Sequence, residues 1–167
     1  LAAGLGTVEL CVAPELQAFD WQGLGLPGGL VWSEQGEGDL GARMGRAAQR
    51  VTAGDEAILL IGTDCPALDS SLLQIAAAAL QDHDASLVPT ADGGYALLGL
   101  KRFDPTLFDA MPWSTDAVGA ETRRRVAQLD WRLHTLPTLH DIDEPQDLPW
   151  LPAELQAGLP TTSQPNP

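Results

Sequence analysis

The sequence has 167 residues, 44% of them hydrophobic, and a formal net charge of −14. This composition is typical of a globular chain with a core of its own and excludes intrinsic disorder. The acidic surplus repels nucleic acid and anionic lipid, so we expect neither as a partner. No apolar run approaches the roughly 18–20 residues of a membrane span. The two cysteines, Cys11 and Cys65, form neither a disulfide framework nor a zinc site; we expect buried thiols and a cytoplasmic protein.

Hydrophobic patterning predicts strands that alternate with helices along the chain. The expected elements, in chain order, are a strand over 7–12, a Gly- and Pro-rich loop over 19–29, a strand over 30–32, a helix over 40–51, a strand over 57–61, a helix from 69 or 70 to 82, strands over 85–88 and 95–100, a helix from 115 or 116 to 129, a strand over 131–136 and a short helix after Asp143. This alternation predicts an α/β fold with a mainly parallel sheet, in which ligands bind at the carboxyl ends of the strands.

The sharpest chemical signal is the run Gly62-Thr63-Asp64-Cys65-Pro66, directly after an apolar strand. Gly62 allows close approach to the backbone, and Pro66 stiffens the turn. A carboxylate at this position is suited to Mg²⁺ or Mn²⁺, hard cations that take oxygen ligands and keep phosphates as partners. The alternative is that Asp64 only caps a turn.

A second acidic segment lies near the end of the chain, where Asp141 and Asp143 flank Ile142. In an extended segment their side chains point to the same side, and two like charges on one face need a cation or solvent between them. The alternative is that Asp143 is a helix N-cap. The neighbouring His140 is a weaker candidate for a ligand or base.

Two further motifs combine turn residues with groups that suit a ligand. Asp92-Gly93-Gly94-Tyr95 predicts a tight hairpin turn whose glycines let main chain lie against a flat or anionic group, with a plain hairpin as the alternative. Pro112-Trp113-Ser114-Thr115 precedes a helix that carries Arg123, Arg124 and Arg125. Ser114 or Thr115 could cap that helix, its N-terminus would attract an anion, and Trp113 could stack on a base or sugar. The alternative is a buried tryptophan beside a solvated arginine face.

The run from Gln35-Gly36 through Asp39-Leu40-Gly41-Ala42-Arg43-Met44 is a loop that leads into a helix, and Gln35 or Arg43 could face a ligand. This run and the motifs above occur together and in order. The set resembles a short bacterial family of glycosyltransferase-like proteins called "transferase 1", associated with radical-SAM or selenium domains. That family is similar to the guanylyltransferases of the molybdenum-cofactor and phospholactate pathways. The resemblance covers about residues 1–150 and implies a GT-A fold, a three-layer nucleotide-diphospho-sugar transferase-like sandwich. It also implies a nucleotide sugar or nucleoside triphosphate as substrate and Mg²⁺ or Mn²⁺ as cofactor, with the acceptor open.

By this resemblance, each motif takes a role. Asp64, Asp141 and Asp143 would bind the metal, and Asp92 would be the catalytic base. The residues expected to bind the nucleotide are Gly62, Thr63, Asp64, Gly93, Gly94, Tyr95, Trp113, Ser114 and Thr115. The family opens with a strand and a basic phosphate loop that have no counterpart here. We therefore expect residues 1–151 to form a GT-A-like domain without that strand, followed by a Pro-rich tail over 152–167.

Three functions are compatible with these residues. The first is metal-dependent transfer of a glycosyl group, with nucleotidyl transfer as its close alternative. The second is a non-catalytic nucleotide-binding remnant, which the missing basic loop favours. The third is a phosphohydrolase with Asp141 and Asp143 as its nucleophile pair, which the late position of the pair disfavours. The oligomeric state is left open, with a homo-oligomer as one option.

Overall fold

The computed structural model describes residues 2–156 of the chain. The elements in chain order are β1 (Glu9–Val12), η1 (Gln22–Leu24), β2 (Val31–Glu34), α1 (Leu40–Thr52), β3 (Ile58–Ile61), α2 (Ser70–Ala79), β4 (Ala85–Pro89), β5 (Tyr95–Leu100), η2 (Pro105–Leu107), α3 (Val118–Gln128), β6 (Leu133–Thr135), η3 (Pro145–Trp150) and α4 (Ala153–Gln156). Every predicted strand and long helix is confirmed. The predicted loop over 19–29 contains the 3-10 turn η1, and most of the predicted tail lies outside the described residues.

The main sheet has four strands in the order β3-β5-β4-β6. β5 is antiparallel to both β3 and β4, whereas β4 and β6 are parallel. β3, β4 and β6 therefore share one direction, and β5 is the exception. A tight turn joins β4 to β5, so β5 must return antiparallel beside it, as the predicted hairpin required.

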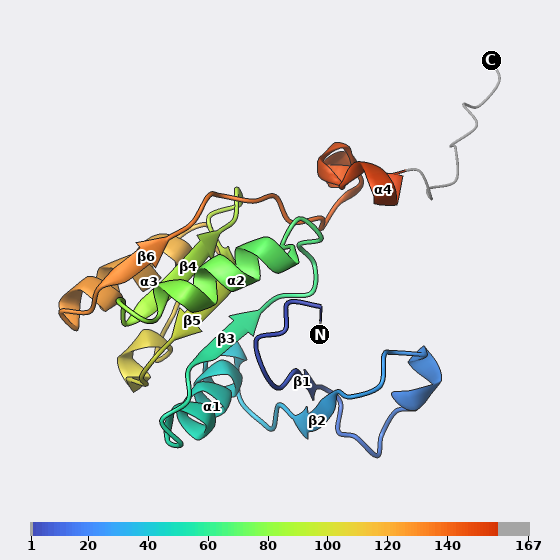
Figure 1. Ribbon diagram of the computed structural model, residues 1–167, viewed down its shortest axis with the longest axis horizontal. Coiled ribbons are helices and arrows are strands. Elements are labelled where there is room, and N and C mark those ends of the chain that lie inside the picture. The colour runs from blue at the N-terminus through green and yellow to red at the C-terminus, as the bar shows by residue number, and fades with distance from the viewer. Residues whose placement is uncertain (1, 157–167) are drawn as a thin grey trace.

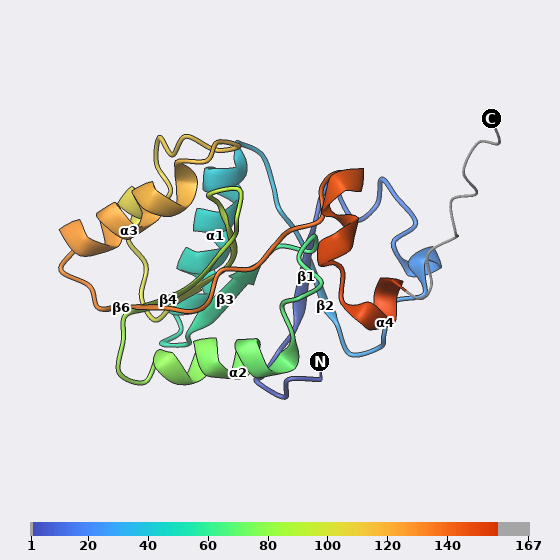
Figure 2. The same ribbon diagram turned by 90° about the horizontal axis from the view of Figure 1, so that it is seen from above.

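Helices cover both faces of this sheet. Viewed from above, α1 and α3 lie on one side of the strands and α2 on the other (Figure 2). Two clusters of buried side chains fill the two interfaces: Leu87 and Leu98 belong to the α1/α3 side, and Val88 and Leu97 to the α2 side. Successive residues of a strand point to opposite faces, which explains why β4, packed between two helix layers, is buried along its whole length. The expected three-layer α/β sandwich is confirmed.

β1 and β2 form a separate parallel pair (Figure 1). Within residues 2–156, β1 is paired only with β2, and β3 only with β5. Side chains of α1 hold the β1–β2 pair: Arg50 forms an ion pair of 2.5 Å with Glu9, and Arg46 donates to the carbonyl groups of Gln35 and Glu37. The first strand of the resembled family would lie between β1 and β3 and pair with both, and this placement stays a prediction.

The helix starts only partly follow the sequence expectations. Asp69 caps α2 by accepting from the Leu72 amide at 2.8 Å, as predicted. The predicted cap of α3 by Ser114, Thr115 or Asp116 is wrong, because the N-cap residue is Ala117, which makes no side-chain bond. Instead the Gly119 amide donates to the carbonyl oxygen of Gly93, at 2.8 Å. A backbone acceptor from another element thus satisfies a free donor of the first turn.

The segment after β6 also differs from expectation. The N-cap of η3 is Glu144, so the alternative that Asp143 caps a helix there is wrong. Asp147 accepts from the amides of Asp143 and Glu144, at 3.2 and 2.9 Å. Of the two free cysteines, Cys65 is buried as predicted, whereas Cys11 is only half-buried.

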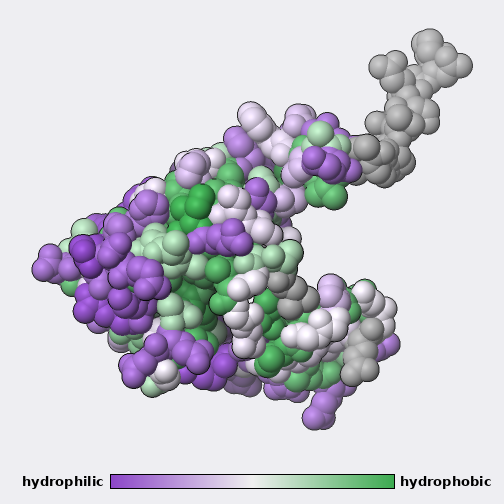
Figure 3. All heavy atoms as spheres, viewed as in Figure 1, coloured by the Kyte–Doolittle hydropathy of each residue, from purple (hydrophilic) through white to green (hydrophobic). Residues whose placement is uncertain are grey.

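Exposed hydrophobic side chains gather on the two parts that project from the main sheet. Phe19 and Leu24 are exposed on the loop between β1 and β2, and Trp150 and Leu155 on η3 and α4. The surface is notched between these two parts (Figure 3). Among the helices of residues 2–156, none has both the length and the apolar character needed to cross a bilayer.

Candidate functional site

The carboxyl ends of three parallel strands bring the predicted acidic residues to one edge of the sheet. β3 leads into Asp64, β4 leads into Asp92, and the chain beyond β6 leads to Asp141 and Asp143. Main-chain hydrogen bonds fix these segments side by side. The Ile142 amide donates to the Asp64 carbonyl at 3.0 Å. This edge is where α/β sheets usually bind ligands.

Main-chain bonds also continue the sheet beyond β4 and β6. The Leu139 amide donates to the Pro89 carbonyl and the Ala91 amide to the Leu139 carbonyl, each at 2.9 Å. The Cys65 thiol donates to the carbonyl of His140 at 3.4 Å. The segment that carries Asp141 is therefore held against both neighbouring strand ends by backbone contacts.

A cavity of about 780 Å³ opens at this edge. Of the predicted site residues, its wall contains Gly62, Asp64, Asp92, Gly94, Tyr95, Trp113, Ser114, Thr115, Asp141 and Asp143. Thr63 and Gly93 do not line it. The four predicted carboxylates, which are far apart in sequence, thus face one cavity.

Asp92 is fixed by its own turn. Its Oδ1 accepts from the Thr90 hydroxyl at 2.5 Å and from the Gly94 amide at 2.8 Å. Partial burial acts to raise the pKa of Asp92, but these bonds and one with Asp141 outweigh it, so the pKa lies below its ordinary value. A lowered pKa weakens a carboxylate as a general base and keeps it ionised.

Asp141 has the opposite tendency. Partial burial, followed by the charges of Asp92, Asp143 and Asp64, raises the pKa of Asp141. Burial disfavours the charged form, and repulsion between like charges that share the site disfavours ionisation further. A divalent cation among these carboxylates would relieve that repulsion.

Two of the glycines lie close to other protein atoms. A Cβ at Gly62 would lie 2.7 Å from the Asp64 carboxylate. A Cβ at Gly93, where φ is +95°, would lie 2.2 Å from the carbonyl oxygen of Asp116. The β4–β5 turn therefore packs main chain against main chain at the start of α3, which also brings Asp116 to the cavity wall.

The aromatic residues at the site belong both to the core and to the cavity. Trp113 and Tyr95 pack against the α1/α3 core and also line the cavity. Burial raises the pKa of Tyr95 despite a hydrogen bond with Thr122, so its hydroxyl stays neutral. A Cβ at Gly41 would lie 2.7 Å from Trp113 Nε1, so α1 supports the indole closely. The Thr115 hydroxyl donates to the Pro112 carbonyl at 2.7 Å.

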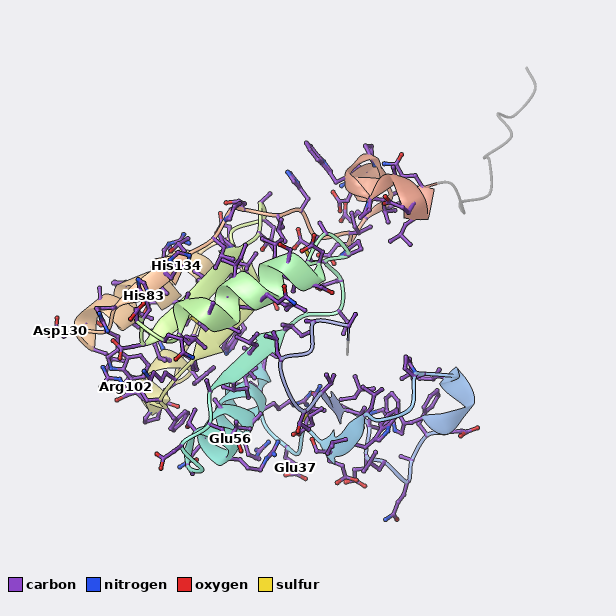
Figure 4. All side chains as sticks on the ribbon, in the orientation of Figure 1. Glu37, Glu56, His83, Arg102, Asp130 and His134 are labelled. Atoms are coloured by element: carbon purple, nitrogen blue, oxygen red, sulfur yellow. The ribbon has the colours of Figure 1, made fainter. Side chains whose placement is uncertain are left out.

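Several polar residues outside the cavity make contacts within the protein. The Arg125 guanidinium, whose side chain is 11% exposed, binds Glu121 and the carbonyls of Thr106, Asp109 and Ala110. His140 stacks on Trp150 at a centroid distance of 3.8 Å. His83 and His134 lie together, with ring centroids 5.2 Å apart, near the start of β6 and away from the β4–β5 turn (Figure 4).

The wall formed by α1 is the part that sequence reasoning mostly missed. Leu40, Arg43, Met44 and Ala47 line the cavity from one face of this helix, together with Gln35. Their spacing of three and four residues is that of a helix face and could have indicated a shared surface. Thr90 was also missed, although it lines the cavity and its hydroxyl donates to Asp92.

The donor set of the site suits Mg²⁺ or Mn²⁺, which take oxygen ligands. Within the described part of the chain, no three His, Cys, Asp or Glu side chains stand in an arrangement ready to hold a metal. Mg²⁺ is usually bound by one or two carboxylates, with the remaining ligands from water and substrate phosphates. The aspartates of the cavity fit that mode, and their roles as metal ligands stay predictions.

Comparison with known proteins places the chain in a family. Residues 1–115 match the family described as "Uncharacterized protein conserved in bacteria (DUF2064)", and the chain belongs to it. A comparison with curated proteins gives no match. A solved structure from Desulfovibrio desulfuricans G20, a "putative nucleotide-diphospho-sugar transferase", is 28% identical with a TM-score of 0.73. The match covers 83% of this chain but only 62% of that one. The fold is thus that of a nucleotide-diphospho-sugar transferase-like protein.

Proposed function

We propose that this member of DUF2064 is a metal-dependent glycosyltransferase that acts on a nucleotide-activated sugar. The observation that carries the proposal is the convergence of Asp64, Asp92, Asp141 and Asp143 on one cavity at the carboxyl edge of the sheet. A phosphate-bearing donor could enter such an acidic site only with a cation. The solved relative, which resembles 83% of this chain, supports a nucleotide sugar as the donor class.

A divalent ion bound here would neutralise the donor phosphates and stabilise charge on the leaving group. Asp64 and Asp143 would hold it, because they come from two neighbouring segments joined by the Ile142–Asp64 main-chain bond. Asp141 and Asp92 face the same space. Of these two, Asp92 is the base expected from the sequence, and the bonds of its turn keep it ionised and able to accept a proton from an acceptor hydroxyl.

The test measures Mn²⁺ binding by calorimetry and donor turnover with a panel of nucleotide sugars. Asp64→Asn keeps the shape of the side chain but removes its charge, so it should lose Mn²⁺ affinity and turnover. Asp82→Asn, at an exposed position just after α2, is the matched control and should behave like wild type. Equal Mn²⁺ affinity in wild type and Asp64→Asn would refute the metal assignment.

Product analysis separates the competing chemistries. Release of a nucleoside diphosphate from a nucleotide sugar supports glycosyl transfer. Release of pyrophosphate from a nucleoside triphosphate would instead support nucleotidyl transfer at the same site. Metal-dependent binding without turnover of either donor class would support the non-catalytic alternative.

A further inference from the structure

The charge on the walls of the large cavity is unevenly distributed. Among the described residues, five aspartates line it, Asp64, Asp92, Asp116, Asp141 and Asp143, whereas Arg43 is the one basic residue that does so. The aspartates come from the strand ends and the start of α3. Arg43 comes from the first turns of α1, on a wall that is otherwise apolar. An anionic ligand therefore meets a single fixed positive charge of the protein.

The guanidinium of Arg43 is already positioned. Its Nε donates to the Gly38 carbonyl at 2.9 Å and its Nη1 to Gln35 Oε1 at 3.2 Å. Gln35 is itself held, since its Nε2 donates to the Cys11 carbonyl at 3.0 Å. Among the contacts of residues 2–156, no acceptor binds Nη2 of Arg43. A guanidinium group that is already fixed by hydrogen bonds on one side loses little side-chain entropy when its open side binds an oxyanion.

The neighbouring arginines of α1 differ in this respect. Arg46 lies on a separate, smaller cavity, of about 260 Å³, and donates to the Gln35 and Glu37 carbonyls. Arg50 is paired with the Glu9 carboxylate at 2.5 Å. Both therefore connect α1 to the β1–β2 part. Arg43 makes a similar connection, but it is the one of the three that also lines the large cavity.

We infer that Arg43 is an oxyanion-binding residue of the cavity and takes a phosphate of the ligand on the wall that α1 forms. This inference rests on the proposed function and adds to it a second, metal-independent point of attachment. It limits the ligand to molecules with an anionic group, and it assigns the α1 wall to binding rather than to chemistry. Because guanidinium binds oxyanions in a bidentate manner, lysine should replace it only partly.

The test measures binding of pyrophosphate, uridine diphosphate, glucose 1-phosphate and neutral uridine to the full chain, with Mg²⁺ and with a chelator. Arg43→Met should weaken binding of the phosphate compounds roughly tenfold to hundredfold, the usual size for loss of a charge-assisted hydrogen bond. It should leave uridine binding unchanged. Arg102→Met, which removes an exposed cation just after β5 at the end of that strand away from the cavity, should change affinity by less than about twofold. A loss confined to uridine diphosphate indicates a nucleotide phosphate, and a loss confined to glucose 1-phosphate indicates a sugar phosphate.

Arg43→Gln, which keeps a donor toward Gly38, replaces the methionine variant if that variant melts at much lower temperature. Phosphate binding equal to wild type in a folded Arg43 variant would overturn the inference and leave the proposed function intact. Phosphate binding that depends on Arg43 but not on Mg²⁺ or Asp64 would support the inference and contradict the metal-dependent function. Absence of phosphate binding to wild type would overturn the inference as well.

Discussion

The close contact between Gly93 and the main chain of Asp116 predicts that adding one methyl group at Gly93 strongly destabilises the fold. In Gly93→Ala, the new Cβ would lie 2.2 Å from the carbonyl oxygen of Asp116 and 2.7 Å from its carbonyl carbon. These are main-chain atoms, so no side chain can rotate away, and the turn must separate from α3. The residue would also have to keep a φ of +95°, which side chains disfavour.

Three costs add up for this variant. The backbone conformation costs about 1–2 kcal/mol, and forced overpacking costs about 1–3 kcal/mol. The lost bond between the Gly119 amide and the Gly93 carbonyl, now 2.8 Å, costs about 1 kcal/mol. The total is about 3–6 kcal/mol, which in a chain of this size lowers Tm by roughly 6–24 °C.

Thermal unfolding followed by circular dichroism measures this loss, and Gly94→Ala is the matched control. A Cβ at Gly94 meets the Thr90 hydroxyl at 3.1 Å and the Asp92 carboxylate at 3.2 Å, both of which are side-chain groups that can shift. Its cost should be about 1 kcal/mol. A Gly93→Ala variant that melts within 2 °C of wild type, or above Gly94→Ala, would refute this account of the turn.

Two further predictions concern charged groups. Burial and neighbouring carboxylates raise the pKa of Asp141 above its ordinary 3.8, so the folded state holds this proton more tightly than the unfolded chain does. The ionised form therefore costs stability above the folded pKa, and without metal Asp141→Asn should raise Tm at pH 7 by roughly 1–3 °C, a small gain because solvent screens the group. The gain in Tm should disappear as the pH falls below 3.8, where Asp141 is protonated in both the folded and the unfolded chain. An equal gain in Asp82→Asn, or a gain that persists in acid, would contradict this explanation. Arg125→Met leaves three carbonyls without their donor and should cost about 3 kcal/mol, or roughly 6–12 °C in Tm. The exposed Arg123→Met should change Tm by less than about 2 °C; similar melting of these two variants would show that the Arg125 contacts are weak.

The sequence predicted most of the helices and strands because the residues that determine each of them are adjacent in the chain. The apolar run of β3 and the Asp69 cap before α2 depend on residues that are adjacent in the chain. The hairpin of β4 and β5 follows from the two glycines between apolar runs. Periodicity and turn chemistry act within a few residues, so a single sequence contains them.

The wrong predictions share a non-local cause. Thr115 looked like a helix cap, but α3 receives its acceptor from Gly93, twenty-odd residues earlier in the chain. Arg125 looked like part of a solvated face, but its guanidinium holds the carbonyls of the loop that contains η2. In both cases, a distant backbone group satisfies a donor, and no local pattern shows which group that will be.

The sequence by itself determined the residue types of the site, namely carboxylates placed just after strands and glycines beside them. Only the tertiary structure decided that Asp64, Asp92, Asp141 and Asp143 share one cavity and that Arg43 faces it from α1. The reason is the direction of the strands. β3, β4 and β6 run the same way, so residues that follow their ends meet at one edge of the sheet, and α1, packed on one face of that sheet, supplies a further wall.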